Sequence, residues 1–265
     1  MTQQKEHHSS KKIRKNFLVV SNYNNNIQWV PEYTDHYIVY DRSDSSIYTN
    51  NIDPHKIKKS PNIGYNLYDY FTFIIDHYDE LPDVTIFAKG NIFPRHVTQT
   101  YFDRIMNNEY FTPIEDHRMH KEKWPAGLFS ADGGFCQLNG DQYLHNHPLR
   151  YFATYNDFLT FCYKDPLIPR YLRFAPGGNY IVPRENILKL PKIFYENLRL
   201  FISYCPLPGE AHIIERALYT LWMSNFELND IMLTPVDAST MTIRTESLSQ
   251  RIKKGIVALI RAVRR

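Results

Sequence analysis

Polar side chains suited to nucleotide binding stand directly after short apolar runs of the sequence. Ser21 and Asn22 follow "LVV", Asp41 follows "YIVY", and Lys89 follows "TIFA". Each apolar run is typical of a buried strand. Ligands of open α/β sheets bind outside the carboxyl ends of the strands. These polar side chains therefore predict a nucleotide-binding edge.

An Asn-x-Gly turn precedes a long amphipathic segment in "PNIGYNLYDY", residues 61–70. Asn62 and Gly64 are turn formers, and the apolar spacing that follows them is helical. A helix N-terminus presents backbone N–H groups, which bind phosphate. We therefore expect Asn62 and Gly64 to lie at the same edge, beside a phosphate. The alternative is an ordinary turn.

Two further motifs carry groups that could act on a substrate. In "APGGNYIV", Gly177 and Gly178 let the backbone approach a ligand where a Cβ would collide; the alternative is a hairpin bend. Glu215 and Arg216 lie at the boundary of the apolar face of a helix predicted over 209–226. They form either a surface ion pair or an inward-pointing functional pair.

Histidines and cysteines give weaker signals. His117-x-x-His120 and His145-x-His147 could hold a metal, whereas solvated loop histidines are the simpler reading. The 3 cysteines form no Cys-x-x-Cys pair, so neither a disulfide framework nor a zinc ribbon is expected. No P-loop, Gly-x-Gly-x-x-Gly or Ser-His-Asp pattern occurs in the sequence.

The elements that position these residues alternate between strands and helices. Strands over 17–20, 36–41 and 83–90 enclose a helix over 65–81, and a second helix is expected over 96–108. This order predicts one α/β domain with a doubly wound, mostly parallel sheet. Later helices are expected over 187–204 and 209–226, whereas 111–170 has no clear pattern.

Composition limits the function classes. Lys+Arg 31 against Asp+Glu 28 gives a net charge of +3, too balanced for a nucleic-acid-binding surface. The apolar stretch near the N-terminus is shorter than a signal-peptide core or a membrane span, so a cytoplasmic protein is expected. We divide the chain into a disordered basic segment 1–15, a domain 16–245 and a basic helix 246–265.

The predicted C-terminal helix alternates basic and apolar residues and contains no acidic residue from Ser247 to Arg265. One face would be apolar, and the remaining faces would carry arginine and lysine. This pattern is typical of a helix that lies on an anionic membrane surface. The alternative is a helix docked on its own domain or on a second subunit.

The sequence resembles a family of uncharacterised glycosyltransferase-like proteins of fungi and of bacterial surface-polysaccharide loci, and more distantly capsule and rhamnan glycosyltransferases. The resemblance covers 17–110 and 170–225, and its most specific part is the block from the Asn-x-Gly turn to the end of the next strand. The matching residues are Asn62, Gly64, Tyr78, Asp79, Leu81, Pro82, Asp83, Phe87 and Gly90. Asn66 stands where an acidic residue is usual.

The resemblance implies a nucleotide-diphospho-sugar transferase (GT-A-like) sheet that binds a nucleotide-sugar donor at Ser21, Asn22, Asp41, Asn62, Gly64 and Lys89. Gly177, Gly178 and Asn179 would line the sugar and acceptor side, with Glu215 as base and Arg216 or Lys89 as charge clamp. The metal-binding Asp-x-Asp of many such enzymes is absent. Either a divalent cation (Mn or Mg) is held elsewhere, in 115–132, or Lys89 replaces it.

The implied function is transfer of a sugar to a growing capsule or lipopolysaccharide-type glycan. The enzyme would lie in the cytoplasm, peripheral to the inner face of the membrane, and its acceptor would be a glycan or a lipid-linked sugar. Two alternatives remain open. One is a non-catalytic sugar- or nucleotide-binding module of an assembly complex, and the other is a histidine-metal hydrolase that uses 115–147.

Overall fold

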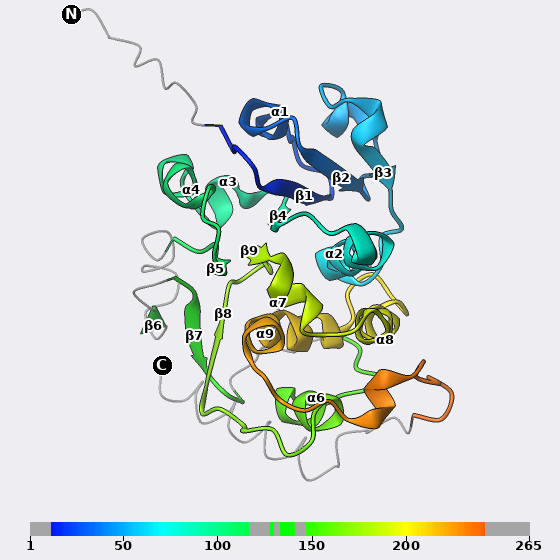
Figure 1. Ribbon diagram of the computed structural model, residues 1–265. Coiled ribbons are helices and arrows are strands. Elements are labelled where there is room, and N and C mark those ends of the chain that lie inside the picture. Colours follow the sequence, from blue (N-terminus) through cyan, green and yellow to red (C-terminus); the bar gives the residue numbers. More distant parts are fainter. Residues whose placement is uncertain (1–11, 117–127, 130–132, 141–146, 242–265) are drawn as a thin grey trace, which may run out of the picture.

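A six-stranded sheet lies between two groups of helices (Figure 1). The structure is a computed structural model, and it describes residues 12–116, 128–129, 133–140 and 147–241. The tail 246–265 and its predicted membrane helix therefore lie outside the described residues, as do His117, His120 and His145.

The main sheet has the strand order β3-β2-β1-β4-β9-β5. The strands β3, β2, β1 and β4 are parallel, whereas β9 is antiparallel to both β4 and β5. A mostly parallel α/β sheet is thus confirmed. The strands are β1 (Phe17–Asn22), β2 (Tyr37–Asp41), β3 (Ile57–Lys59), β4 (Val84–Lys89), β5 (Thr112–Pro113) and β9 (Tyr180–Pro183).

Helices cover both faces of the sheet because the strands are apolar on both faces. On one face lie α1 (Trp29–Tyr33), α3 (Ile92–Arg95) and α4 (Gln99–Ile105). On the other lie α2 (Tyr65–Asp76), α8 (Lys192–Ile202) and α9 (Gly209–Met223), with α6 (Tyr155–Cys162) packed on α9 and α7 (Arg184–Leu188) after β9. Short 3₁₀ helices occupy Ser46–Thr49, Pro54–Lys56, Tyr78–Glu80 and Asp230–Leu233.

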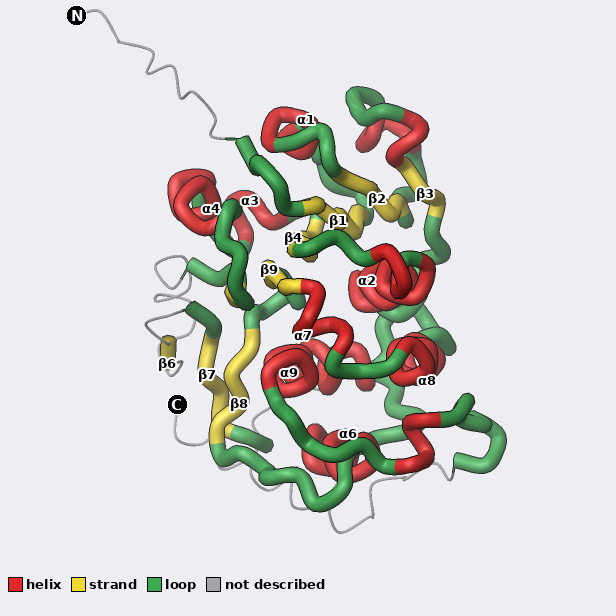
Figure 2. The backbone as a smooth tube through the Cα atoms, in the orientation of Figure 1, coloured by secondary structure: helices red, strands yellow, loops and turns green. Residues whose placement is uncertain are grey.

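A small antiparallel sheet stands beside the main one (Figure 2). It comprises β6 (Leu128–Phe129), β7 (Phe135–Leu138) and β8 (Tyr171–Phe174). The chain passes from β8 through the glycine motif into β9 of the main sheet. The motif is therefore not a hairpin bend, because the strands on its two sides belong to different sheets.

Several predicted boundaries are wrong, and the helix expected over 65–81 ends at Asp76. Ile13 is buried and its N–H donates to Tyr33 O at 2.8 Å, so the folded chain begins before residue 16. The helix expected over 187–204 is divided into α7 and α8, because Pro191 cannot continue a helix and becomes the N-cap of α8. The helix expected over 96–108 begins after Thr98, whose hydroxyl accepts the N–H of Tyr101.

The described residues include no helix that is both long and apolar enough to cross a bilayer. The larger core lies between the sheet and the layer of α2, α8 and α9. At its centre, Phe87 of β4 stacks on Trp222 of α9, with ring centroids 5.8 Å apart. This contact joins the sheet to the last long helix.

The core makes a direct prediction for stability. Leu198, on the buried face of α8, is 0% exposed, whereas Leu167 is 77% exposed. We expect Leu198→Ala to lower the free energy of unfolding by about 2–5 kcal/mol, because it leaves a cavity, and Leu167→Ala to change it by less than about 0.5 kcal/mol. Urea unfolding followed by circular dichroism measures both. Equal losses would place α8 outside the core.

Candidate functional site

The order of the strands creates a switch point between β1 and β4. From β1 the chain continues to β2 and β3 on one side, then crosses through α2 to β4 on the other side. At such a point the loops leave the carboxyl ends of the strands in opposite directions and open a crevice. The predicted edge residues of β1, β2 and β4 lie at this place.

The alternation of side chains along the strands decides which edge residues meet. Each of three residues comes two positions after a residue whose side chain points into the core under α2. These three residues, Ser21, Arg42 and Lys89, therefore face that same side of the sheet. Those core residues are Val19, Tyr40 and Phe87. Asn22 and Asp41 have the opposite parity and lie together on the other side.

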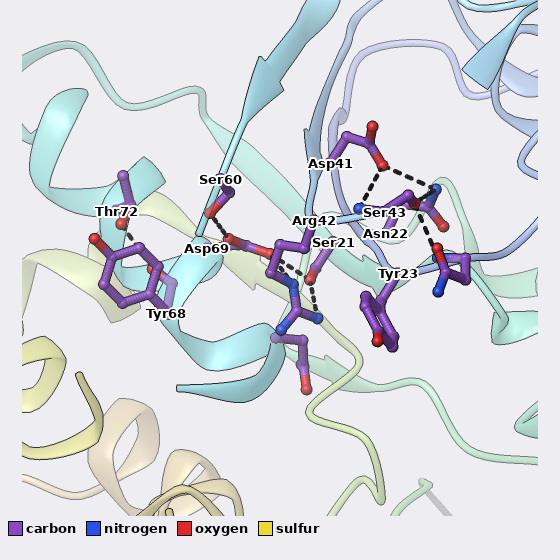
Figure 3. A network of polar contacts seen from close by, with 12 residues as sticks. Ser21, Asn22, Tyr23, Asp41, Arg42, Ser43, Ser60, Tyr68, Asp69 and Thr72 are labelled. Carbon is purple, nitrogen blue, oxygen red and sulfur yellow. Dashed lines mark hydrogen bonds and ion pairs between the residues drawn. The ribbon is translucent and has the colours of Figure 1, made fainter. Parts of the chain in front are cut away.

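The side facing α2 is organised by Asp69, a buried carboxylate of that helix (Figure 3). Its Oδ2 accepts the hydroxyl of Ser21 at 2.5 Å and lies 3.1 Å from Nε of Arg42. Its Oδ1 accepts the hydroxyl of Ser60 at 2.5 Å. Arg42 also donates to Ser21 Oγ at 3.2 Å. One carboxylate therefore joins α2 to the ends of β1 and β2.

The protonation of Asp69 reflects opposing effects. Burial raises the pKa of this carboxyl to about 6, although Arg42 and the hydroxyls of Ser21 and Ser60 favour the charged form. Sequence reasoning missed both Asp69 and Arg42. The available signal was an aspartate within an otherwise apolar helix segment.

The other side brings Asn22 and Asp41 together, as expected (Figure 3). Asn22 Nδ2 lies 3.4 Å from Asp41 Oδ1 and 3.2 Å from Ser43 Oγ. Lys59 Nζ lies 2.5 Å from Asp41 Oδ2. The side chain of Asp41 is 0% exposed, so its direct task is to hold Asn22 and the loop after β2. The adjacent ring of Tyr23 is 41% exposed at the same edge.

Gly90 fits closely against this group. A Cβ at Gly90 would lie 2.3 Å from Asn22 Oδ1, and the Gly90 carbonyl accepts Trp29 Nε1 at 3.1 Å. A larger residue would displace the Asn22 amide. Close packing therefore explains why Gly90, the last of the residues that match the glycosyltransferase-like family, is a glycine.

The turn at Asn62 and Gly64 is confirmed, and Gly64 has a φ of 63°. However, the N–H groups of Gly64 and Tyr65 donate to the carbonyls of Cys205 and Pro206, at 3.0 and 3.2 Å. The loop after α8 thus uses the donors nearest the turn, so a phosphate role for Asn62 and Gly64 stays a prediction that this geometry does not favour. A Cβ at Gly64 would also lie 2.9 Å from Ile202 O, so a larger residue would disturb the fold.

The glycine motif packs on the start of α2. Gly177 and Gly178 both have positive φ, at 85° and 66°. Asn66 Nδ2 donates to Gly177 O at 2.9 Å, and Asn179 Oδ1 accepts the backbone N–H of Lys89 at 2.9 Å. A carboxylate at position 66 could not donate this bond, which explains the departure of Asn66 from the acidic pattern.

Glu215 and Arg216 are both buried, so the surface-pair alternative is wrong. Arg216 donates to Gln137 Oε1 at 3.0 Å and to His212 O at 2.9 Å, and it lies over the ring of Phe174. It therefore joins α9 to the small sheet, and its role as a charge clamp stays a prediction. Burial raises the pKa of Glu215, whereas Arg216, Lys89 and the N–H of Gly177 lower it. These neighbours place Glu215 under the glycine motif, beside the end of β4.

A line of residues continues from Lys89: sequence reasoning left out Tyr65 and His212 and considered His147 only as a metal ligand. Lys89 Nζ lies 2.9 Å from Tyr65 OH and 4.3 Å from the centre of that ring. The Tyr65 ring lies 5.7 Å from His212, whose ring lies 4.6 Å from that of His147. Burial lowers the pKa of His212 to about 4, and the positive charges of His147, Arg216 and Lys89 add to this effect.

Metal binding gains no support within the described part of the chain, where no group of three His, Cys, Asp or Glu side chains could hold an ion. A divalent cation held by 115–132 stays a prediction. A cavity of about 880 Å³ lies at the opposite edge of the sheet, between the start of β1, the start of β4 and α7. Ion pairs between Lys15 and Glu109 and between Arg184 and Asp83 occupy its wall.

The raised pKa of Asp69 predicts a pH dependence of stability. Between about pH 4 and pH 6 the folded chain keeps a proton on Asp69 that the unfolded chain has released. The Asp69 contribution to the free energy of unfolding should therefore be greatest below about pH 4 and fall by about 2–3 kcal/mol as the pH rises to about 6.

Asp69→Asn should remove this fall, so the difference between wild type and variant should itself depend on pH. Asp76→Asn, on the exposed end of the same helix, is the matched control and should leave the pH profile unchanged. Urea unfolding at a series of pH values measures all three proteins. An identical profile for wild type and Asp69→Asn would show that the pKa of Asp69 does not change on folding.

Comparison with known proteins identifies a family without naming an activity. No curated protein and no solved structure matches the chain. A family model matches residues 18–239, from β1 to beyond the last described helix, and thus includes the whole site described above. The chain belongs to this family, described as Protein of unknown function (DUF3431).

Proposed function

We propose that the chain is a nucleotide-sugar-dependent glycosyltransferase whose donor binds at the carboxyl edge of β2, β1 and β4. The observation that carries this proposal is the switch point between β1 and β4, with Asn22, Asp41 and Lys89 at the strand ends. Open α/β sheets bind their ligands at such a place. The resemblance to glycosyltransferase-like proteins of the GT-A-like type supports the same reading.

The nucleoside has a suitable neighbour at the end of β1. Tyr23 follows directly on Asn22 and is 41% exposed at the carboxyl end of β1. Aromatic rings stack on nucleobases of any type. Asn22, Asp41 and Ser43 hold the loop that carries this ring. We therefore place the base at Tyr23 and the diphosphate towards Lys89.

The sugar would then reach the glycine motif and α9. Transfer requires that the acceptor hydroxyl lose its proton while it bonds to the anomeric carbon, and that the diphosphate leave with the electrons of the broken bond. The raised pKa of Glu215 makes its carboxylate a stronger base than an exposed glutamate. We propose Glu215 as the group that accepts this proton.

The acceptor is proposed to be a growing surface glycan of the capsule or lipopolysaccharide type, free or linked to lipid. A basic helix over 246–265, outside the described residues, would bring the enzyme to an anionic membrane surface. Loss of liposome sedimentation in a chain ending at Glu246 would support this partner.

A donor screen tests the function itself. Thermal shift with UDP-, GDP-, CMP- and dTDP-sugars, with and without manganese, should show stabilisation by one nucleotide class, because a ligand bound only to the folded state raises the melting temperature. Release of the free nucleotide from that donor, a nucleoside diphosphate or, for a CMP-sugar, CMP, would show an enzyme. Binding without any turnover would instead favour the non-catalytic module, and the absence of any shift would contradict both.

Tyr23→Ala should weaken the affinity for the donor found in this screen by about 10- to 100-fold, because stacking on one base contributes about 1–3 kcal/mol. Tyr110→Ala is the matched control, since Tyr110 is 66% exposed but precedes β5, at the opposite edge of the sheet. Isothermal titration calorimetry measures both. If the two variants bind alike, the base does not stack on Tyr23.

Glu215→Gln should lower turnover by about 10²- to 10⁴-fold while the donor affinity changes little, because the amide keeps the shape but cannot accept the proton. Glu109→Gln, at an exposed carboxylate, controls for the substitution type. Steady-state release of nucleoside diphosphate gives both constants. Full turnover in Glu215→Gln would reduce this carboxylate to a structural role.

A further inference from the structure

We infer that Lys89, Tyr65, His212 and His147 form the diphosphate site, and that His212 takes up a proton when a diphosphate binds. This inference rests on the proposed function for the identity of the ligand. It adds Tyr65, His212 and His147, none of which the strand-end pattern indicates, and it gives the site a pH dependence.

The geometry joins three segments that are distant in the sequence. Lys89 comes from the end of β4, Tyr65 from the first turn of α2, and His212 from the first turns of α9. Lys89 Nζ lies 2.9 Å from Tyr65 OH, and the rings continue at 5.7 Å to His212 and 4.6 Å to His147. Lys89 is almost buried at the end of β4. The cluster thus offers an ammonium, a phenol and two imidazoles within one short line.

The charges around His212 are mainly positive or able to become so. Among the described residues, the charged and titratable groups placed beside His212 include Lys89 of β4, Tyr65 of α2, His147 of the adjoining loop and Arg216 of α9. Glu215 of α9 lies beside Lys89 and Arg216. Burial and the neighbouring cations keep His212 neutral, with a pKa of about 4.

A bound diphosphate reverses this balance. Its negative charge stabilises the imidazolium, so the pKa of His212 rises on binding and a proton is taken from solvent. The free protein holds His212 neutral above about pH 4, whereas the complex holds it charged up to its new, higher pKa. Affinity for a diphosphate must therefore increase as the pH falls through this interval.

The position of His147 is fixed from the start of α9. The carbonyl of Pro148 accepts the Gly209 N–H at 2.7 Å, and Glu210 Oε1 accepts the N–H groups of Arg150 and Tyr151 at 2.6 and 2.5 Å. A Cβ at Gly209 would lie 2.4 Å from Leu149 Cδ2, so a larger residue would displace the Leu149 side chain. The segment after His147 is thus anchored to the helix that carries His212.

Calorimetry with inorganic pyrophosphate, UDP, GDP and dTDP tests the inference on the full chain. Titrations at pH 6 in buffers of different ionisation enthalpy count the protons taken up. We expect a proton uptake that approaches about one in the wild type and is lost in His212→Asn. Protons that the ligand itself takes up or releases are common to both proteins, so they cancel in the difference between the two titrations. His55→Asn, at an exposed histidine, is the matched control and should behave as wild type.

Lys89→Met should weaken diphosphate binding by about 10- to 100-fold, since it removes a charged donor. Thermal melting of each variant without ligand shows whether the fold persists.

If a nucleoside diphosphate binds to Lys89→Met and His212→Asn with the same affinity and the same proton uptake as to the wild type, the inference is wrong while the proposed function stands. If pyrophosphate and all three nucleotides fail to bind but a nucleotide sugar does, the diphosphate lies elsewhere. If the nucleotide sugars also fail, both proposals fall.

Discussion

The Asp69 carboxylate is the interaction on which the arrangement of the site depends. It accepts the hydroxyls of Ser21 of β1 and of Ser60 before the turn into α2, and it forms an ion pair with Arg42 after β2. A buried carboxylate without such partners would be very unfavourable, so each partner must stay in place once the helix has packed. The register of α2 on the sheet is thereby fixed, and with it the position of Tyr65 one turn earlier.

The two faces of the sheet edge then acquire different tasks. On the side of α2, polar groups lie between the sheet and α9. They are the network around Asp69 and the pair of Lys89 and Tyr65. On the other side, Asn22 and Asp41 brace the loops that follow β1 and β2 and leave Tyr23 exposed. A donor laid across both sides would have its base on the second and its charged diphosphate on the first.

Much of this edge could be predicted from the sequence. Strand ends at Asn22, Asp41 and Lys89 and the helix after Gly64 followed from apolar runs and turn formers, which are local signals. The antiparallel β9, the small sheet and the contacts of Asp69 and His212 could not be predicted, because they depend on segments far apart in the chain. Asn66 illustrates the limit of sequence reasoning. An asparagine in place of an acidic residue is explained only by its hydrogen bond to the Gly177 carbonyl, which the structure shows.

The most direct measurement is a crystal structure of the chain with the nucleoside diphosphate or nucleotide sugar that stabilises it most. The account predicts the diphosphate oxygens within hydrogen-bond distance of Lys89 Nζ and the base against the ring of Tyr23, at the carboxyl ends of β1 and β4. A ligand in the cavity at the opposite edge, beside Asn16 and Asp83, would contradict it.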